Sequence, residues 1–344
     1  MKEALVSKGP KVQIVDSPIP KPGPNQVVTK VIVSGSNPKD WKRPEWSPDD
    51  TPPANQGDDI SGIVHAVGAQ VSEFQPGDRI AAFHEMMAPG GSYAEYATSW
   101  AHTTFHLPPP TTFEQGAAIP LAAMTAAIAL YARLGLPQPW LPAPPGTKIP
   151  LIIYGAGSAV GSYAVQLAQR SNIHPLICVA GKAHAHVAAL LSPERGDVIV
   201  DYRQPAPALV QALRDALAGA KLEHAFDAVS EKGSYENICH VLDPDSGKIT
   251  LVLPGKQYAG IPPGVQQSLT RVGDVHADLK DFGYVYFRYM AKGLAEGWFK
   301  AQPQEVVAGG LEGVERGLAD LKEGRASAVK YVFRIADTPG VGRE

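Results

Sequence analysis

An apolar segment that runs into a glycine-rich turn constrains the fold of this chain more than any other feature. Residues 149–154 are apolar, the turn has glycines at positions 155, 157 and 161, and residues 159–168 repeat small and apolar side chains at helical spacing. This strand, turn and helix are typical of the start of a dinucleotide-binding βαβ unit, where N–H groups at a helix N-terminus bind phosphate. The third glycine comes one residue later than in G-x-G-x-x-G. Many strand-to-helix turns also need glycine for backbone reasons alone.

The residues after the next apolar segment indicate which dinucleotide binds. Residues 175–180 follow at the interval that a βαβ crossover requires. At the end of this strand an NAD-selecting unit carries Asp or Glu for the ribose 2′-hydroxyl, whereas this chain has Gly-Lys-Ala-His at 181–184. Lys182 would attract a 2′-phosphate, so we expect NADPH. The alternative is a solvated surface lysine. Tyr202 is a second candidate to pack on the adenosine end.

Composition limits the class of protein and its partners. The chain has 344 residues, enough for two domains, and is 44% hydrophobic and 19% charged, as in ordinary soluble globular proteins. A net charge of −3 argues against nucleic acid or an anionic membrane as the main partner. Two cysteines are too few for a disulfide framework, and no apolar run is long enough for a signal peptide or a bilayer span. We therefore expect a cytoplasmic protein.

The order of the predicted elements divides the chain. Short strands separated by turns predict a compact barrel, and they are expected at residues 11–15, 26–33, 60–67, 80–83 and 92–97. Alternating strands and helices predict a doubly wound parallel sheet of α/β class, and they are expected at residues 149–154, 159–168, 175–180, 198–201, 206–217, 224–229, from 235 and 248–253. Helices over 122–134, 286–297 and 310–323 and a strand over 328–334 complete the prediction.

Motifs spread over nearly the whole chain resemble one family. The chain is similar to the zinc-independent medium-chain dehydrogenases/reductases, in particular to the fungal quinone-oxidoreductase-like proteins and the trans-acting enoyl reductases of polyketide synthases. The segments that carry the resemblance are Ser36–Lys42, Gly57–Val64, Gln75–Arg79, Gly91–Tyr96, Ala118–Ala127, Tyr154–Gln166 and Lys330–Phe333. The resemblance implies a GroES-like β-barrel catalytic domain (1–124 with 293–344) and a Rossmann domain that binds NADPH (125–292).

The chain departs from the alcohol dehydrogenases of that family at their zinc sites. Those enzymes have a Cys within the segment that corresponds to 34–37, and Gly-His-Glu where this chain has Gly57-Asp58-Asp59. A catalytic zinc needs three Cys, His or carboxylate ligands, and no thiolate accompanies the two aspartates. The cysteines of the structural zinc lobe are missing as well. We expect no metal, and reduction of a C=C bond already activated by a carbonyl needs none.

The resemblance assigns catalytic roles to the segment that begins at Asn37. Lys42 lies where the trans-acting enoyl reductases have a lysine near the nicotinamide. It would contact the cofactor ribose or the substrate carbonyl, or deliver the proton, and the alternative is a surface lysine beside Arg43. Asp40 is expected to orient this active-site loop by hydrogen bonds rather than to act as an acid.

The resemblance also places the cofactor and the substrate. Thr125 would bond the nicotinamide carboxamide, unless it is a buried helix threonine that bonds its own backbone. The expected cofactor residues are Lys39, Trp41, Thr125, Gly157, Ser158, Ala159, Val160, Gly181, Lys182, Ala183, His184, Tyr202, Val252, Leu253, Lys330 and Tyr331. The expected substrate residues, in a cleft between the domains, are Phe83, Met86, Leu121, Phe282 and Tyr284. An apolar lining suits an enone, a quinone or an enoyl thioester.

The predicted function is NADPH-dependent, zinc-independent transfer of hydride to the activated C=C of an α,β-unsaturated carbonyl. The substrate would be an enone or an enoyl thioester, including a polyketide intermediate delivered by a polyketide synthase. Two alternatives stay open: a quinone oxidoreductase, and a low-turnover NADPH-binding partner protein of the same fold. The sequence leaves the choice between monomer and homodimer open.

Overall fold

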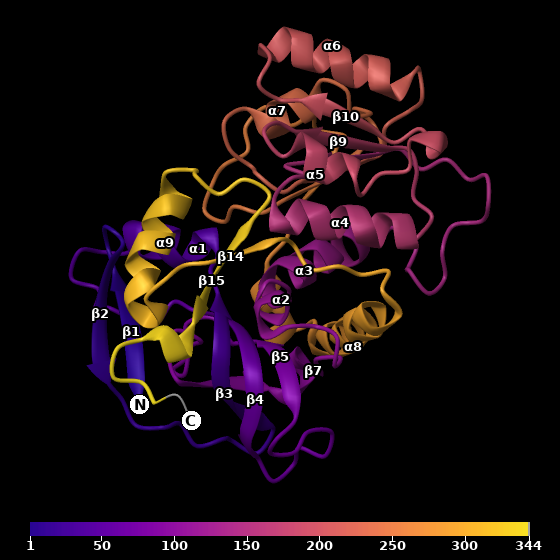
Figure 1. The fold of residues 1–344 in the computed structure, drawn as a ribbon. Coiled ribbons are helices and arrows are strands. Elements are labelled where there is room, and N and C mark those ends of the chain that lie inside the picture. The colour runs from indigo at the N-terminus through magenta and orange to yellow at the C-terminus, as the bar shows by residue number, and fades with distance from the viewer. Residues whose placement is uncertain (343–344) are drawn as a thin grey trace. The chain divides into compact units, whose positions relative to one another are not determined.

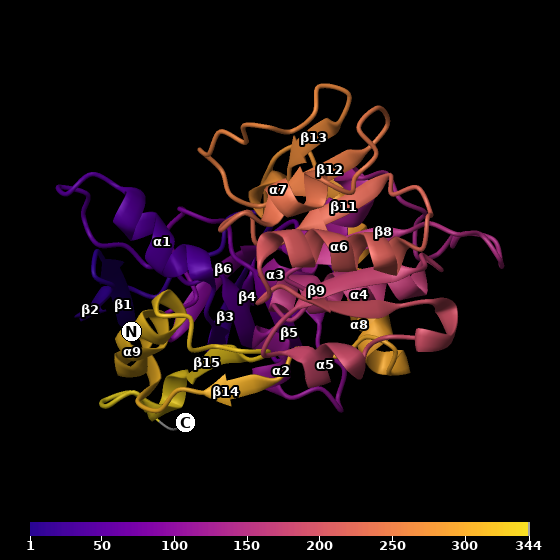
Figure 2. The same cartoon turned by 90° about the horizontal axis from the view of Figure 1, so that it is seen from above.

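The longest strand of the first unit, β3 (Gln26–Gly35), explains how that unit is built. Its β-branched residues Val27, Val31 and Val33 are buried, so the strand lies in the core. It pairs antiparallel with β4, β6 and β15. The resulting sheet has the order β14-β15-β3-β4-β5-β7, with β6 added on β3, and Figure 2 shows β14 and β15 side by side.

The computed structural model describes residues 1–342, which form two units. The first holds residues 1–124 and those from 273 on, and the second holds residues 125–272. We expected the second unit to extend to residue 292, but α8 (Lys280–Glu296) belongs to the first. The ring of Phe287 in α8 stacks on Phe105 at 5.5 Å between centroids, and Arg288 pairs with Glu73. These contacts hold the helix against the first unit.

The first unit has the following further elements. Its strands are β1 (Lys2–Ser7), β2 (Lys11–Asp16), β4 (Asp59–Val67), β5 (Arg79–Phe83), β6 (Tyr96–Trp100), β7 (Thr104–His106), β14 (Gln304–Val306) and β15 (Lys330–Arg334). Its α-helices are α1 (Pro38–Trp46), α2 (Phe113–Ala117), α8 and α9 (Gly313–Lys322), and α3 (Pro120–Ala127) runs from the first unit into the second.

The second unit is a six-stranded sheet whose paired strands are all parallel, in the order β10-β9-β8-β11-β12-β13. Its strands are β8 (Leu151–Tyr154), β9 (Leu176–Ala180), β10 (Val198–Asp201), β11 (His224–Asp227), β12 (Lys248–Leu251) and β13 (Gln266–Leu269). Its α-helices are α4 (Ala159–Arg170), α5 (His184–Ala188), α6 (Ala206–Leu217) and α7 (Ser234–Cys239). Helix α4 packs on β8 and α6 on β9 and β10 (Figure 1). This is the predicted doubly wound sheet.

Four of the expected segments illustrate how the structure differs from the sequence prediction. The expected active-site loop forms helix α1, because Asn37 and Asp40 form a capping box and Pro38 occupies the first turn. The strand expected at 92–97 is β6 (Tyr96–Trp100), and α8 begins at Lys280 rather than near 286. The helix expected over 122–134 is α3 followed by a π-helix (Ile128–Arg133).

Candidate functional site

The glycine-rich turn after β8 has close backbone contacts at each of its glycines. Gly155 adopts a φ of +82°, and a Cβ there would lie 2.6 Å from Cγ2 of Val229. A Cβ on Gly157 would collide with that of Ala183, and one on Gly161 with the backbone of Gly155. The backbone explanation of these glycines therefore holds, and it is compatible with a phosphate site, because the turn leads directly into a helix N-terminus.

That helix, α4, exposes N–H groups at its first turn. Ser158 caps it by accepting a hydrogen bond from the Gly161 N–H at 3.0 Å. Ser158 is exposed, and Ala159 and Val160 are half-buried. The first N–H groups of an α-helix have no intrahelical partners and attract anions. The structure thus places three of the predicted phosphate residues at a helix N-terminus that a ligand can approach.

The predicted adenosine residues come together at the ends of β9 and β10. A Cβ on Gly181 would lie 2.7 Å from the ring of Tyr202, so the tyrosine ring lies directly over this glycine. Tyr202 is 46% exposed and Lys182 is exposed. Within residues 1–342, Lys182 has no ion pair. An exposed ring and an exposed cation therefore lie at the same edge of the sheet, at the carboxyl ends of its strands.

Two further groups at this edge were not predicted from the sequence. The Arg203 guanidinium binds the Asp201 carboxylate through Nε, at 2.9 and 3.0 Å, and through Nη2, and this contact lowers the pKa of Asp201 to about 2. The His186 Nε2 contacts Ser162 Oγ at 3.0 Å, whereas the predicted His184 is exposed. Arg203 could have been found from the sequence, because it directly follows Tyr202 and so places a second cation next to the predicted adenosine end.

The ends of β11 and β12 form the other half of the same edge. The buried Asp227 accepts hydrogen bonds from the N–H groups of Val229 and Ser230 and from Ser234 Oγ. Ser230 Oγ in turn accepts from the N–H of the predicted Val252 at 2.9 Å, and the Leu253 carbonyl accepts from Tyr258. Burial raises the pKa of Asp227. Thr125, also predicted, is buried in α3 with 7% exposure.

In the first unit, the predicted residues Lys39 and Asp40 form a group with three residues that were not predicted site residues. We call this group the Lys39 cluster: Lys39, which is half-buried, and Asp40, Asp58, His84 and Tyr93, which are buried. The Lys39 ammonium contacts Asp58 Oδ2, Asp40 Oδ1 at 3.1 Å and the Gln56 carbonyl at 2.6 Å. Asp58 Oδ1 contacts His84 Nδ1 at 3.0 Å, and Tyr93 donates to Asp40 at 2.6 Å. The ammonium thus donates a hydrogen bond to one backbone carbonyl and forms ion pairs with two carboxylates. Lys39 therefore binds carboxylate and carbonyl groups within the first unit.

The charges of the Lys39 cluster depend on one another. Burial raises the pKa of Asp40 to about 6. Burial would also raise that of Asp58, but Lys39 and His84 outweigh it and hold the pKa below its usual value. Burial likewise opposes the charge of Lys39, yet the two carboxylates raise its pKa. The cluster thus keeps a lysine and an aspartate ionised inside the protein.

A second buried ion pair lies next to this cluster. Lys330 Nζ contacts Asp59 Oδ2 and Asn37 Oδ1, each at 2.7 Å, and Asn37 Nδ2 donates to Asp59 at 2.8 Å. The other oxygen of Asp59 accepts from the Leu121 N–H at 2.7 Å. Asn37, Asp59 and Lys330 therefore hold the start of α1 against β4 and β15. The ring of Tyr331, another predicted cofactor residue, is 5% exposed and packs in the barrel core.

Asp40 and Lys42 occupy different environments on α1. Asp40 accepts from the Asn37 N–H at 2.7 Å and is fully buried, so it caps the start of the helix. Lys42 is half-buried, with Nζ 5.6 Å from the centroid of Trp41. Lys322 lies 5.9 Å from the same ring. Trp41 thus has two ammonium groups near it.

The predicted substrate residues are distributed over the first unit. Phe83 is buried at the end of β5, 5.0 Å from the ring of His276, and Leu121 is 8% exposed. Met86 is half-buried, with its methyl group close to Gly273. Phe282 stacks on Tyr286 at 4.2 Å within α8. Tyr284 is 46% exposed, beneath the Arg288 guanidinium, and lines a surface hollow of about 480 Å³ with Trp100, His102 and Lys280.

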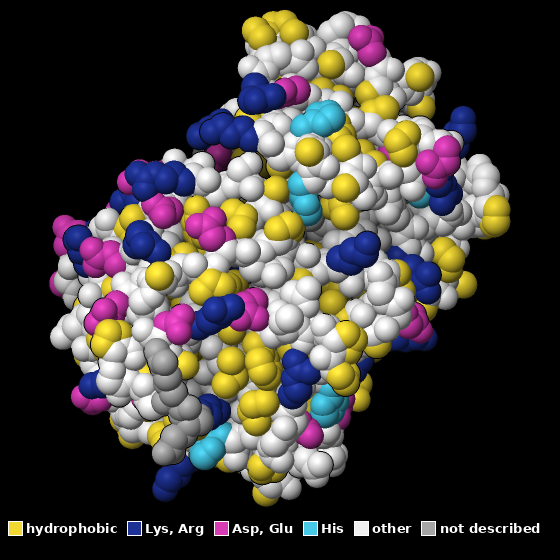
Figure 3. Space-filling view, viewed as in Figure 1, with side chains coloured by type: hydrophobic (Ala, Val, Ile, Leu, Met, Phe, Trp, Pro, Cys, Tyr) yellow, Lys and Arg dark blue, Asp and Glu magenta, His cyan; other side chains and the backbone are white. Residues whose placement is uncertain are grey.

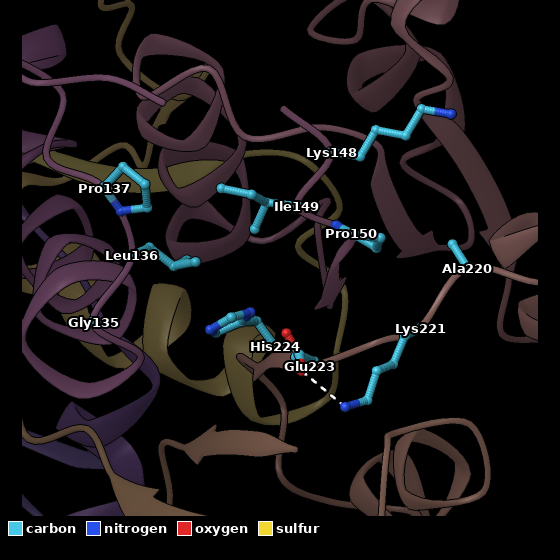
Figure 4. A pocket seen from close by; sticks show the side chains of 10 residues that line it. All are labelled: Gly135, Leu136, Pro137, Lys148, Ile149, Pro150, Ala220, Lys221, Glu223 and His224. Carbon is cyan, nitrogen blue, oxygen red and sulfur yellow. Dashed lines mark ion pairs between the residues drawn. The ribbon is translucent and has the colours of Figure 1, made fainter. Parts of the chain in front are cut away.

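A second hollow lies in the second unit but away from the predicted residues. It has a volume of about 400 Å³ and is lined by residues 135–137, 148–150, 220–221 and 223–224 (Figure 4). These residues precede β8 and β11, so the hollow lies at the amino ends of the strands. Lys221 is paired with Glu223 at 3.0 Å. The predicted cofactor residues of this unit follow the carboxyl ends, where α/β sheets bind ligands.

The residues at the positions of the relatives' zinc ligands do not form a metal site in this structure. Within residues 1–342 no group of three or more His, Cys, Asp and Glu side chains is arranged to hold a metal ion. Asp58 and Asp59 already contact the ammonium groups of Lys39 and Lys330.

No helix within residues 1–342 is both long and apolar enough to cross a bilayer. On the face drawn in Figure 3, basic and acidic side chains are interspersed.

Known proteins are similar to this chain in sequence and in fold. Residues 23–109 match the alcohol dehydrogenase GroES-like domain. The trans-enoyl reductase fsr4 of Gibberella fujikuroi is 58% identical over 314 residues, covering 91% of this chain and 92% of that protein. The trans-enoyl reductase ACTTS2 of Alternaria alternata is 31% identical over 346 residues, covering 96% and 98%. A quinone oxidoreductase from Pseudomonas syringae has a similar fold, with a TM-score of 0.75, 22% identity and coverage of 96% and 99%.

Proposed function

Because this chain belongs to the family of fungal trans-enoyl reductases, and is therefore an oxidoreductase, we propose that it reduces the C=C bond of an enoyl thioester with NADPH. The observation that carries the proposal is the 58% identity with a trans-enoyl reductase over 91% of the chain. The substrate class that follows is a polyketide intermediate held as a thioester and presented by a polyketide synthase. The departures from zinc-binding relatives at Asp58 and Asp59 support a reaction without metal.

The carboxyl edge of the second unit suits a phosphorylated dinucleotide. The absence of a Cβ at Gly157 and Gly181 lets Ala183 and the Tyr202 ring lie directly against the backbone of this edge. The first turn of α4 offers N–H groups to the pyrophosphate. Lys182 provides positive charge at the end where a 2′-phosphate would lie, and Tyr202 provides a ring for the adenine. Arg203 lies at the same end, but its charge is already paired with Asp201. The proposed cofactor is therefore NADPH rather than NADH.

Residues of the first unit support the reaction by holding groups in place. When bound, NADPH supplies a hydride for the β carbon of the substrate, and the carbonyl of the substrate takes up the resulting charge. Asn37, Asp40 and Asp59 fix the start of α1, and Lys42 lies one turn further along the same helix. The Lys42 ammonium is our candidate to contact the cofactor ribose or the substrate carbonyl, or to deliver the proton. Thr125 is our candidate to bond the carboxamide.

A comparison of substrates tests the proposal. We expect NADPH consumption with crotonyl-N-acetylcysteamine and a saturated thioester as the product. Lys42→Ala should lower kcat by roughly 10²-fold or more, as expected for loss of a proton-transferring group. Lys322→Ala is the matched control, because Lys322 lies on the same Trp41 ring, and it should change kcat less than twofold. Consumption with a quinone alone would identify a quinone oxidoreductase. Tight NADPH binding without turnover of any substrate would identify a binding protein.

A further inference from the structure

His276 is a half-buried histidine whose two ring nitrogens are shielded from solvent and unused. It ends the short turn Val272–His276 that precedes α8. Both of its ring nitrogens are shielded from solvent, and among residues 1–342 neither has a hydrogen-bond partner. Nearly all buried polar groups in proteins have a partner, so each exception needs a cause such as a ligand. A buried donor or acceptor left without a partner costs roughly 1–3 kcal/mol.

The neighbours of His276 do not relieve this cost. The ring packs on Phe83 at 5.0 Å and against His102 at 5.9 Å between centroids. His102 Nε2 is already bonded to the Val275 carbonyl at 2.9 Å. Glu85, an acid whose charge acts on His276, accepts from Trp100 Nε1 at 2.6 Å. One oxygen of Glu85 and one ring nitrogen of His102 are therefore engaged elsewhere.

Burial also fixes the charge of His276. It lowers the pKa of the imidazole to about 4, against the opposing effect of Glu85. The ring is thus neutral at pH 7, with one N–H donor and one acceptor nitrogen. A neutral donor in an apolar environment forms a strong hydrogen bond with an oxygen without adding a charge.

The surroundings indicate what would bind this donor. Phe83, on which the ring packs, and Met86 are both predicted to line the substrate pocket. The Met86 side chain is half-buried, and its methyl group lies close to Gly273, three residues before His276. Methionine is flexible and can move aside for a ligand. An oxygen entering between these apolar side chains would find the unused N–H of His276.

We propose that His276 binds the substrate, by donating a hydrogen bond to the carbonyl oxygen of the enoyl group. The carbonyl is the one oxygen that every activated olefin carries, and it is where negative charge collects during reduction. The inference rests on the proposed function, and it assigns a residue that the sequence motifs did not identify. A hydrogen bond to this oxygen becomes stronger as the negative charge develops. It therefore stabilises the transition state of the reduction more than it stabilises the bound substrate.

The test compares His276→Phe with His276→Gln, which keeps a donor. We expect His276→Phe to lower kcat/KM for crotonyl-N-acetylcysteamine at least tenfold and to leave the Kd for NADPH within twofold. His276→Gln should restore part of kcat/KM. Removing the unused polar atoms should raise the midpoint temperature of the ligand-free protein, whereas loss of a purely structural histidine would lower it. His65→Phe is the control, since that ring is exposed and packs on Tyr96 at 4.9 Å between centroids.

The outcomes separate the two proposals. A change in kcat/KM of less than twofold in His276→Phe would overturn the role of His276. If the wild-type protein reduces no thioester, the proposed function fails. The Kd of the thioester for the complex with NADP⁺ then decides the role of His276. Binding at least tenfold weaker in His276→Phe would support it, and equal binding, or no binding to the wild type, would reject it.

Discussion

The Lys39 cluster of the first unit and the carboxyl edge of the second unit use their charged residues in opposite ways. In the Lys39 cluster, the ammonium contacts two carboxylates and a backbone carbonyl, and Asp40 and Asp58 are at most 1% exposed. At the carboxyl edge, Lys182 is exposed and Tyr202 is 46% exposed. A motif residue that already has internal partners stabilises the fold, and one that lacks them is available to a ligand.

Because of this difference, the residues of the sequence motif around α1 do not all qualify as candidates to bind a ligand. Asn37, Lys39 and Asp40 belong to the segment that resembles an active-site loop, yet their contacts are internal. Lys42 and Trp41, from the same segment, are half-buried. The comparison therefore separates residues that position the segment from those that remain candidates to contact the cofactor.

The largest expected effect comes from removing the cation of the Lys39 cluster. Lys39→Met leaves Asp58 and Asp40 buried without their counter-charge, and it should lower the free energy of unfolding by roughly 3–5 kcal/mol. Urea denaturation measures this change. Lys11→Met is the control, because the Lys11–Glu315 pair is exposed and should contribute at most about 1 kcal/mol. Equal effects of the two substitutions would remove the distinction between the two regions.

The free energy of unfolding depends on pH through Asp40 of the Lys39 cluster. The pKa of Asp40 is about 6 in the folded chain, against 3.8 as the ordinary value. Between pH 4 and 6 the folded chain holds a proton that the unfolded chain has released, so the free energy of unfolding falls as pH rises. Asp40→Asn removes this contribution. The stability of the wild type relative to Asp40→Asn should fall by roughly 2 kcal/mol from pH 4 to pH 7. A difference that rises with pH would contradict the assignment.

The smallest effect belongs to the exposed edge. Lys182→Ala should raise the Kd for NADPH about tenfold, or roughly 1.4 kcal/mol, and leave the Kd for NADH and the midpoint temperature unchanged. Isothermal titration calorimetry measures both dissociation constants. Lys148→Ala is the control, since Lys148 is an exposed lysine of the same unit at the opposite edge of the sheet. An equal loss of NADH affinity would show that Lys182 does not select the 2′-phosphate.

Local patterns in the sequence predicted most of the fold. Helix α6 occupies residues 206–217 as expected, and β10 occupies 198–201, because each has a clear apolar period and turn residues at its ends. Helix α1 was missed, although Asn37, Pro38 and Asp40 carry the capping signal, because the family resemblance suggested a loop. Helix α8 starts earlier than expected, and its first two residues, Lys280 and Asp281, are polar and exposed.

The candidate site was less predictable where contacts join distant parts of the chain. The turn after β8 and the residues after β9 were predicted, because each follows a strand in a recognisable βαβ pattern. The pairing of Lys330 with Asp59 joins residues 271 positions apart, and no local pattern contains it. The packing of His276 on Phe83 is likewise a tertiary contact. Burial and partner choice at such residues follow from the fold as a whole.

Isotope transfer tests most directly whether NADPH gives its hydride to the β carbon of an enoyl thioester. The wild-type protein is incubated with crotonyl-N-acetylcysteamine and NADPH that carries deuterium at C4, once on each face of the nicotinamide, and the product is analysed by mass spectrometry. We expect a saturated thioester with one deuterium on the β carbon from one of the two labelled cofactors. A product without deuterium from either cofactor, or no saturated thioester at all, would contradict this expectation.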